Sequence, residues 1–149
     1  MSVKILLGKN VSEHIKDDLS LRIAKLKEKN IIPSLAAIIV GNDPASKVYV
    51  RNKSKAFREN NCYSETFKLP DDINEKELID LIKKINNDVR FHGILVQLPL
   101  PKQINANKAL YNIDPMKDVD GFHPLNLGSL LEGNPNFIPC TPNGIIKIL

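Results

Sequence analysis

The sequence predicts an α/β fold in which a mostly parallel sheet is flanked by helices on both faces, giving three layers. Short apolar segments alternate along the chain with segments of helical period, which is typical of βαβ units. The proportions of 42% apolar and 26% charged residues are those of a globular protein, and 149 residues correspond to about one domain. The longest apolar run, Leu35 to Val40, is far shorter than the roughly 20 residues that a membrane span requires.

The first part of the chain is predicted to form a helix, a strand and a second helix. The first helix is indicated by apolar residues spaced three or four apart, namely Val11, Ile15, Leu19, Ile23 and Leu26. Asn10 or Ser12 can cap it. Residues 35–41 form a continuous apolar strand of the kind that is buried on both faces. Asp43 as N-cap and Pro44 in the first turn then begin the second helix.

The same alternation continues before the chain changes character. Residues 63–69 are predicted to be a strand of alternating polarity, residues 74–88 a helix, and residues 92–100 a mostly apolar strand. A short helix is expected over residues 105–112. Residues 113–143 contain five prolines and few periodic stretches, and so long an irregular segment in a compact domain is usually functional.

Charge and cysteine placement argue against several classes of partner. The formal net charge is +4, and the densest basic stretch, Lys47 to Lys55, has no flanking aromatic residues on which bases could stack. We therefore expect no nucleic-acid partner, although attraction of an anionic small ligand is compatible with this charge. Cys62 and Cys140 have neither CxxC nor metal-ligand spacing. The chain is thus predicted to hold no metal and to be cytoplasmic, with an equally reducing compartment as the alternative.

A candidate catalytic cluster lies on the predicted second helix. Ser46, Tyr49 and Lys53 fall within a sector of about 60°, beside the strand end where ligands bind in such sheets. A tyrosine ring can hold a flat substrate and a lysine amine can move protons. Because a free lysine has a pKa of ~10.4, use as a base requires burial or a neutral partner, and Gln97 is the candidate. An exposed helix edge and a water-facing strand end are the open alternatives.

Four ordered segments, residues 40–53, 93–101, 115–122 and 138–144, together resemble the bifunctional methylenetetrahydrofolate dehydrogenase/methenyltetrahydrofolate cyclohydrolase family. The third segment alone, with its Asp-Gly pair, is only an ordinary turn signal. The resemblance implies an oxidoreductase and hydrolase of one-carbon metabolism that supports purine biosynthesis. NADP or NAD would take a hydride from methylenetetrahydrofolate, and water would convert the methenyltetrahydrofolate cation to formyltetrahydrofolate.

The resemblance also implies roles for individual residues. Lys53 would transfer protons in the cyclohydrolase step, Gln97 would hydrogen-bond Lys53, and Tyr49 would stack on the aromatic ring between the pterin and the glutamate. Asp120 would bind the pterin ring. The folate pocket would further include Ser46, Val96, Leu98, Pro99 and Leu100.

The chain departs from the family in its length. Family members are nearly twice as long, and their second half is a Rossmann domain that binds the dinucleotide and contributes most of a homodimer interface. The seven glycines of this chain are never closer than five residues apart, so no dinucleotide fingerprint is present. We therefore expect residues 1–149 to be the folate-binding catalytic domain alone, ending in the interdomain helix that starts near residue 141. Weak or no activity is expected, and the alternative is a folate- or partner-binding module without turnover.

Overall fold

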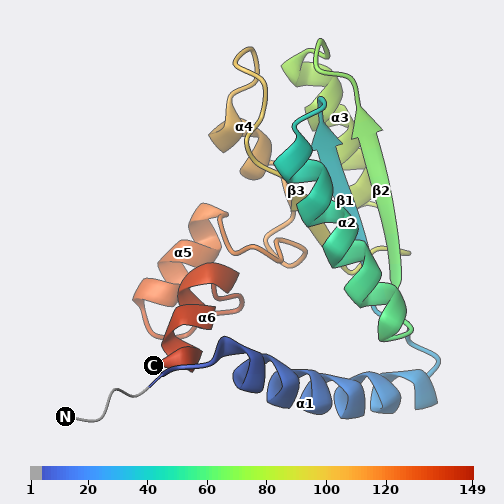
Figure 1. The fold of residues 1–149 in the computed structure, drawn as a ribbon. Helices are drawn as coiled ribbons and strands as arrows, with labels where there is room; N and C mark the ends of the chain where they lie inside the picture. Colours follow the sequence, from blue (N-terminus) through green and yellow to red (C-terminus); the bar gives the residue numbers. More distant parts are fainter. Residues whose placement is uncertain (1–4) are drawn as a thin grey trace.

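The computed structural model describes residues 5–149, so residues 1–4 of the predicted domain lie outside the described range. The elements follow in the order α1 (Gly8–Glu28), β1 (Ser34–Val40), α2 (Pro44–Glu59), β2 (Tyr63–Leu69), α3 (Glu75–Asn86), β3 (Gly93–Val96), α4 (Ala106–Leu110), α5 (Pro124–Leu131) and α6 (Cys140–Ile148). The strands form one parallel sheet in the order β2-β1-β3. Helix α2 covers one face of this sheet and α3 lies behind the other, which confirms the predicted fold class (Figure 1).

The central strand β1 is buried along its whole length, as its continuous apolar sequence predicts. Its side chains alternate between the two faces of the sheet. Ile38 belongs to a core cluster with Leu78 and Ile82 of α3, whereas Ile39 packs in a second cluster with Val50 of α2. The sheet is therefore fixed between two apolar layers, and α2 is anchored through one narrow face.

The start of α2 is fixed by local chemistry that the sequence predicts. Gly41 ends β1 with φ of +79°, a left-handed conformation that glycine adopts without strain. The carboxylate of Asp43 then accepts a hydrogen bond from the backbone N–H of Ser46 at 2.7 Å, and Pro44 occupies the first turn. These contacts place the first turns of α2 at the carboxyl end of the sheet.

Helix α1 differs from its prediction in its start and in its packing. It begins at Gly8 after Leu7, and no side chain caps it, so the assignment of Asn10 or Ser12 as caps is wrong. None of its residues is buried, and Ile15 remains 40% exposed. Figure 1 shows the reason: α1 runs beneath the layers rather than over a face of the sheet. Within residues 5–149, no helix combines the length and the hydropathy that crossing a membrane requires.

The C-terminal part is more regular than its proline content predicts. Helix α5 begins at Pro124, and the preceding His123 caps it by accepting a hydrogen bond from the N–H of Leu125 at 3.2 Å. Histidine is not among the usual capping residues, so only Pro124 in the first turn marks the start of this helix in the sequence. Helix α6 begins at Cys140 after Pro139, close to the expected start near residue 141, and no side chain caps it. Strand β3 ends at Val96, four residues earlier than predicted.

Candidate active site

A pocket of about 520 Å³ lies where the carboxyl end of β3 meets α2. It gathers six of the predicted site residues, namely Tyr49, Lys53, Val96, Gln97, Leu98 and Asp120. The rest of its lining comes from the segment between β3 and the first turn of α6: Phe122, Leu127, Pro139, Cys140, Thr141 and Pro142. The pocket is therefore mostly apolar with a few polar groups that converge on it, which is the usual character of a small-molecule site.

Tyr49 and Lys53 lie one turn apart on α2 and form a pair. The Nζ atom of Lys53 lies 5.1 Å from the centroid of the Tyr49 ring, within the range of a cation–π contact. Tyr49 is 59% exposed, so its ring is accessible to a ligand. Lys53 is half-buried, and no acidic side chain in the described part of the chain forms an ion pair with it. The pair presents a flat aromatic surface with an amine beside it.

Gln97 is held at the end of β3 by the sheet itself. Its backbone N–H donates to the carbonyl of Ile38 at 2.9 Å, and its side-chain Nε2 donates to the carbonyl of Leu98 at 2.7 Å. Across residues 5–149, no hydrogen bond joins Gln97 to Lys53, although both side chains line the same pocket. With Nε2 engaged, the side-chain oxygen of Gln97 is the atom that can accept from the lysine amine.

Asp120 places a carboxyl group in the pocket close to the lysine. It lies in a turn in which the N–H of Gly121 donates to the carbonyl of Asp118 at 3.1 Å. Burial raises the pKa of Asp120, while the positive charge of Lys53 opposes this rise and Asp118 adds to it. Burial likewise raises the pKa of the Cys140 thiol, and Asp120 reinforces the rise. Cys140 is therefore a thiol in the pocket wall rather than a thiolate nucleophile.

The turn that carries Asp120 is anchored by a buried polar network. Asp118 and Asn126 are 1% and 0% exposed, respectively. The Oδ2 atom of Asp118 accepts from the N–H of His123 at 2.8 Å and from Nδ2 of Asn126 at 2.9 Å. Asp118 also pairs with Ile94 of β3 in a parallel bridge. This network ties the Asp120 turn to the sheet on one side and to α5 on the other.

Comparison with known proteins places this geometry in a family. The family described as "Tetrahydrofolate dehydrogenase/cyclohydrolase, catalytic domain" matches residues 6–120. The chain belongs to this family. It is 52% identical over 149 residues to the bifunctional protein FolD of Acetivibrio thermocellus, of which it covers 52%. It therefore spans about half the length of the curated relatives that it matches.

Solved structures of the tetrahydrofolate dehydrogenase/cyclohydrolase family have the same fold over the whole chain. The bifunctional FolD enzyme of Campylobacter jejuni is 45% identical with a TM-score of 0.95, and the match covers 99% of this chain and 53% of that one. The enzyme of Trypanosoma brucei, solved with NADP and an inhibitor, is 33% identical with a TM-score of 0.93. That match covers 100% of this chain and 52% of the other.

The turn between β1 and α2 does not fit the dinucleotide that the family implies. A phosphate bound at a helix N-terminus requires free backbone N–H groups and close glycines. Here the N–H of Ser46 is already taken by the carboxylate of Asp43, whose charge opposes a phosphate, and Gly41 has no glycine neighbours. Among residues 5–149, no group of three or more His, Cys, Asp or Glu side chains is placed to hold a metal ion.

Three residues that the resemblance assigns to the folate pocket of this family do not line the pocket described above. Ser46 is buried behind it, with its hydroxyl donating to the carbonyl of Leu98 at 3.5 Å. Leu100 packs against the core cluster on the α3 side of the sheet, and Pro99 lies between Leu98 and Leu100. Asn126 and Cys140 were not predicted as site residues, because only the folded chain brings Asn126 next to Asp118 and Cys140 close to Asp120.

The raised pKa of Asp120 predicts a dependence of stability on pH. The Asp120 carboxyl group keeps its proton to a higher pH in the folded chain than in the unfolded chain. The free energy of unfolding therefore falls as pH rises above about 3.8. An Asp120→Asn variant should therefore be more stable than the parent at pH 7, and the difference should vanish below pH 3.8. Melting temperatures measured from pH 3 to pH 7 test this.

Asp43 supplies a control of opposite sign. Its hydrogen bonds with Ser46 lower its pKa, so its contribution to stability is present above pH 3.8 and is lost as pH falls through the lowered value. An Asp43→Asn variant should thus be less stable than the parent at pH 7, although asparagine is also a good N-cap. Equal pH profiles for the two variants would contradict the assignment for Asp120.

Proposed function

We propose that this chain is the folate-binding half of a methylenetetrahydrofolate dehydrogenase/methenyltetrahydrofolate cyclohydrolase and carries the groups for the hydrolytic step. The observation that supports this most directly is the single pocket that joins the Tyr49 ring, the Lys53 amine, the Gln97 amide and the Asp120 carboxyl group. These groups come from three separate segments of the chain. A flat, polar-edged substrate fits such a pocket by its shape and its chemistry.

The binding mode follows from the position of each group. The exposed ring of Tyr49 stacks on the aromatic ring between the pterin and the glutamate. The carboxyl group of Asp120 hydrogen-bonds the polar edge of the pterin, and Val96 and Leu98 supply apolar contact. In this pose the one-carbon unit lies near the amine of Lys53, because that amine lies over the Tyr49 ring.

The hydrolytic step needs only groups of this chain and water. Water attacks the cationic methenyl carbon of methenyltetrahydrofolate, and Lys53, after releasing its own ammonium proton to solvent, accepts a proton from it. One carbon–nitrogen bond of the ring then breaks, and the freed nitrogen takes up a proton, which leaves formyltetrahydrofolate. One proton is released overall. Gln97 assists as a neutral partner that can accept a hydrogen bond from the amine without favouring its charged form as a carboxylate would.

The oxidation of methylenetetrahydrofolate needs NADP or NAD as hydride acceptor. Since the β1–α2 turn does not fit a dinucleotide phosphate, we propose that this half of the enzyme contributes the orientation of the folate. We further propose that residues 1–149 are one folate-binding catalytic domain, with α6 leading to a dinucleotide-binding domain, and that the whole enzyme is a cytoplasmic homodimer without a nucleic-acid partner. The free thiols of Cys62 and Cys140 are consistent with a reducing compartment.

Binding and turnover of methenyltetrahydrofolate test the proposed function. We expect the chain to bind the ligand, with Tyr49→Ala weakening the affinity by about tenfold through loss of the stacked ring, and Tyr49→Phe close to the parent. Fluorescence or calorimetric titration gives the affinities, and the near-ultraviolet absorbance of the ligand reports hydrolysis. Binding without hydrolysis would favour the non-catalytic folate-binding module, and equal affinities for Tyr49→Ala and the parent would contradict the site.

A further inference from the structure

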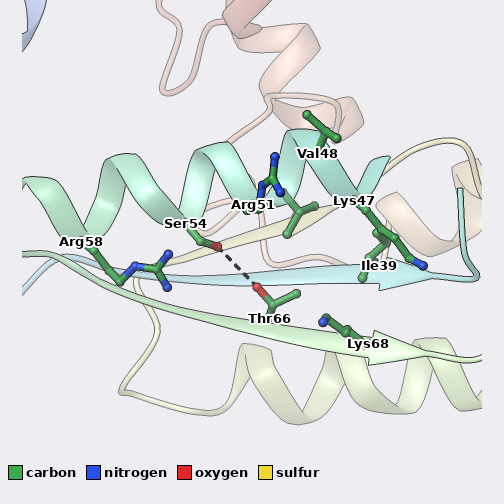
Figure 2. A pocket seen from close by; sticks show the side chains of 9 residues that line it. Ile39, Lys47, Val48, Arg51, Ser54, Arg58, Thr66 and Lys68 are labelled. Carbon is green, nitrogen blue, oxygen red and sulfur yellow. Dashed lines mark hydrogen bonds between the residues drawn. The ribbon is translucent and has the colours of Figure 1, made fainter. Parts of the chain in front are cut away.

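A second pocket lies on the opposite flank of α2 and has a different chemistry. It is a groove of about 500 Å³ between α2 and β2, the edge strand of the sheet. Lys47, Arg51 and Arg58 line it from α2, and Lys68 lines it from β2. Figure 2 shows Arg58 at one end of the groove and Lys47 with Lys68 at the other.

The arrangement of α2 separates this groove from the candidate active site. At about 100° per residue, Lys47, Arg51 and Arg58 fall within a sector of about 40° on one side of the helix. Arg58 and Tyr49 are nine residues apart, which places them about 180° from one another. The cations of the groove and Lys53 therefore belong to two separate sites. Lys53 lies in the candidate active site, and the cations of the groove have no part in the proposed function.

The cations of the groove have no acidic partners within the described residues. The ion pairs found in residues 5–149 join other lysines and arginines to carboxylates, among them Lys55 to Glu59 at 3.6 Å on the same helix. Lys47, Arg51, Arg58 and Lys68 take part in none of them. Four unpaired cations around one hollow create a positive potential that attracts anions.

The floor of the groove is suited to an organic ligand rather than to solvent alone. The hydroxyl groups of Ser54 and Thr66 are hydrogen-bonded to one another at 3.4 Å, as the dashed line in Figure 2 marks. Each hydroxyl oxygen can also bond a polar group of a ligand. The buried side chains of Ile39 and Val50 add apolar contact beside them. A volume of about 500 Å³ is within the range of pockets that hold small molecules.

The spacing of the cations indicates how many charges the ligand carries. Lys47 and Arg58 are eleven residues apart, so their Cα atoms are separated by about 16 Å along the helix axis. One phosphate or carboxylate cannot reach both ends of the groove. We propose that the groove binds a small molecule with two separated anionic groups, phosphate or carboxylate, one near Arg58 and the other between Lys47 and Lys68.

Titration with matched ligands tests the proposal. The probes are a hexose 1,6-bisphosphate, the corresponding hexose 6-monophosphate, and suberate as a dicarboxylate of similar length. We expect at least one two-ended probe to bind at least tenfold more tightly than the monophosphate, because it engages both ends of the groove. Preference for the bisphosphate or for suberate identifies the anionic group, and either preference supports the proposal.

Substitutions at the two ends provide the second arm. Arg58→Gln and Lys68→Gln should each reduce the affinity for the preferred two-ended probe to that of a one-ended ligand. Lys55→Gln, which removes an ion-paired cation of the same helix outside the groove, should leave it unchanged. The side chains of Lys55, Arg58 and Lys68 are all exposed, and melting temperatures verify that each variant is folded.

Three results would overturn the proposal. The first is equal affinity for one-ended and two-ended probes, and the second is an equal effect of Lys55→Gln and Arg58→Gln; both indicate diffuse attraction by net charge. The third is tighter binding of a single-stranded oligonucleotide than of either two-ended probe with a steep dependence on salt, which indicates a nucleic-acid surface. Methenyltetrahydrofolate affinity should stay unchanged in Arg58→Gln, so failure here is distinct from failure at the Tyr49 site.

Discussion

Replacing Lys53 with methionine is expected to reduce the hydrolysis of methenyltetrahydrofolate by at least about a hundredfold, since positioned proton transfer contributes rate factors of this size. Methionine keeps a flexible apolar stem in the half-buried position but has no group that can accept a proton from water. The substitution removes the amine that lies 5.1 Å from the Tyr49 ring and leaves the other pocket groups in place. Single-turnover measurements at high protein concentration, corrected for spontaneous hydrolysis, give the rate.

Two further substitutions separate proton transfer from charge. Lys53→Arg retains a cation over the Tyr49 ring, but a guanidinium does not lose its proton in proteins, so the rate should remain as low as in Lys53→Met. Lys55→Met, on the exposed side of the same helix, should hydrolyse the substrate as fast as the parent. A Lys53→Arg variant with parental rate would show that the charge matters and that the amine is no base.

The sequence was sufficient for the parts of the site that depend on local structure. The Asp43–Pro44 pair predicts where α2 begins, and helical period then places Tyr49 and Lys53 on one flank. The apolar run of β1 predicts a buried central strand. Because ligands bind beyond the carboxyl ends of parallel strands, Gln97 could be expected near that helix without any knowledge of tertiary contacts.

The parts that could not be predicted depend on contacts between distant segments. Phe122, Leu127 and the first turn of α6 enter the pocket only because the chain folds back from β3. Local sequence also cannot show that the amide of Gln97 bonds to its neighbour's carbonyl, since this depends on side-chain rotation. The sequence shows the cations of the basic groove only as a charged stretch. That the groove lies on the side of α2 opposite Tyr49 becomes clear only when the buried face of the helix is known.

The buried carboxylate of Asp118 is expected to be among the most important polar groups for stability. An Asp118→Ala substitution leaves the part-buried N–H of His123 and the buried Nδ2 of Asn126 without this acceptor. Each unsatisfied buried donor costs about 1–3 kcal/mol, although Asn126 keeps its bond to the carbonyl of Pro115. We therefore expect a loss of about 2–4 kcal/mol in the free energy of unfolding. Urea unfolding with a shared slope for parent and variant measures it.

Two milder substitutions test whether the loss of stability comes from the Asp118 network or would follow from any substitution in the C-terminal part of the chain. Asn134→Ala, in an exposed loop after α5, should change the free energy of unfolding by no more than about 0.5 kcal/mol. Asp118→Asn retains one acceptor oxygen and the same shape, so its loss in the free energy of unfolding should lie between those of Asn134→Ala and Asp118→Ala. Because the network holds the turn that carries Asp120, a folded Asp118→Asn protein should also bind methenyltetrahydrofolate more weakly. If Asp118→Ala cost no more than Asn134→Ala, the prediction would be contradicted, and the backbone bridge to Ile94 and the bond from Gly121 to the Asp118 carbonyl would be sufficient to hold the turn.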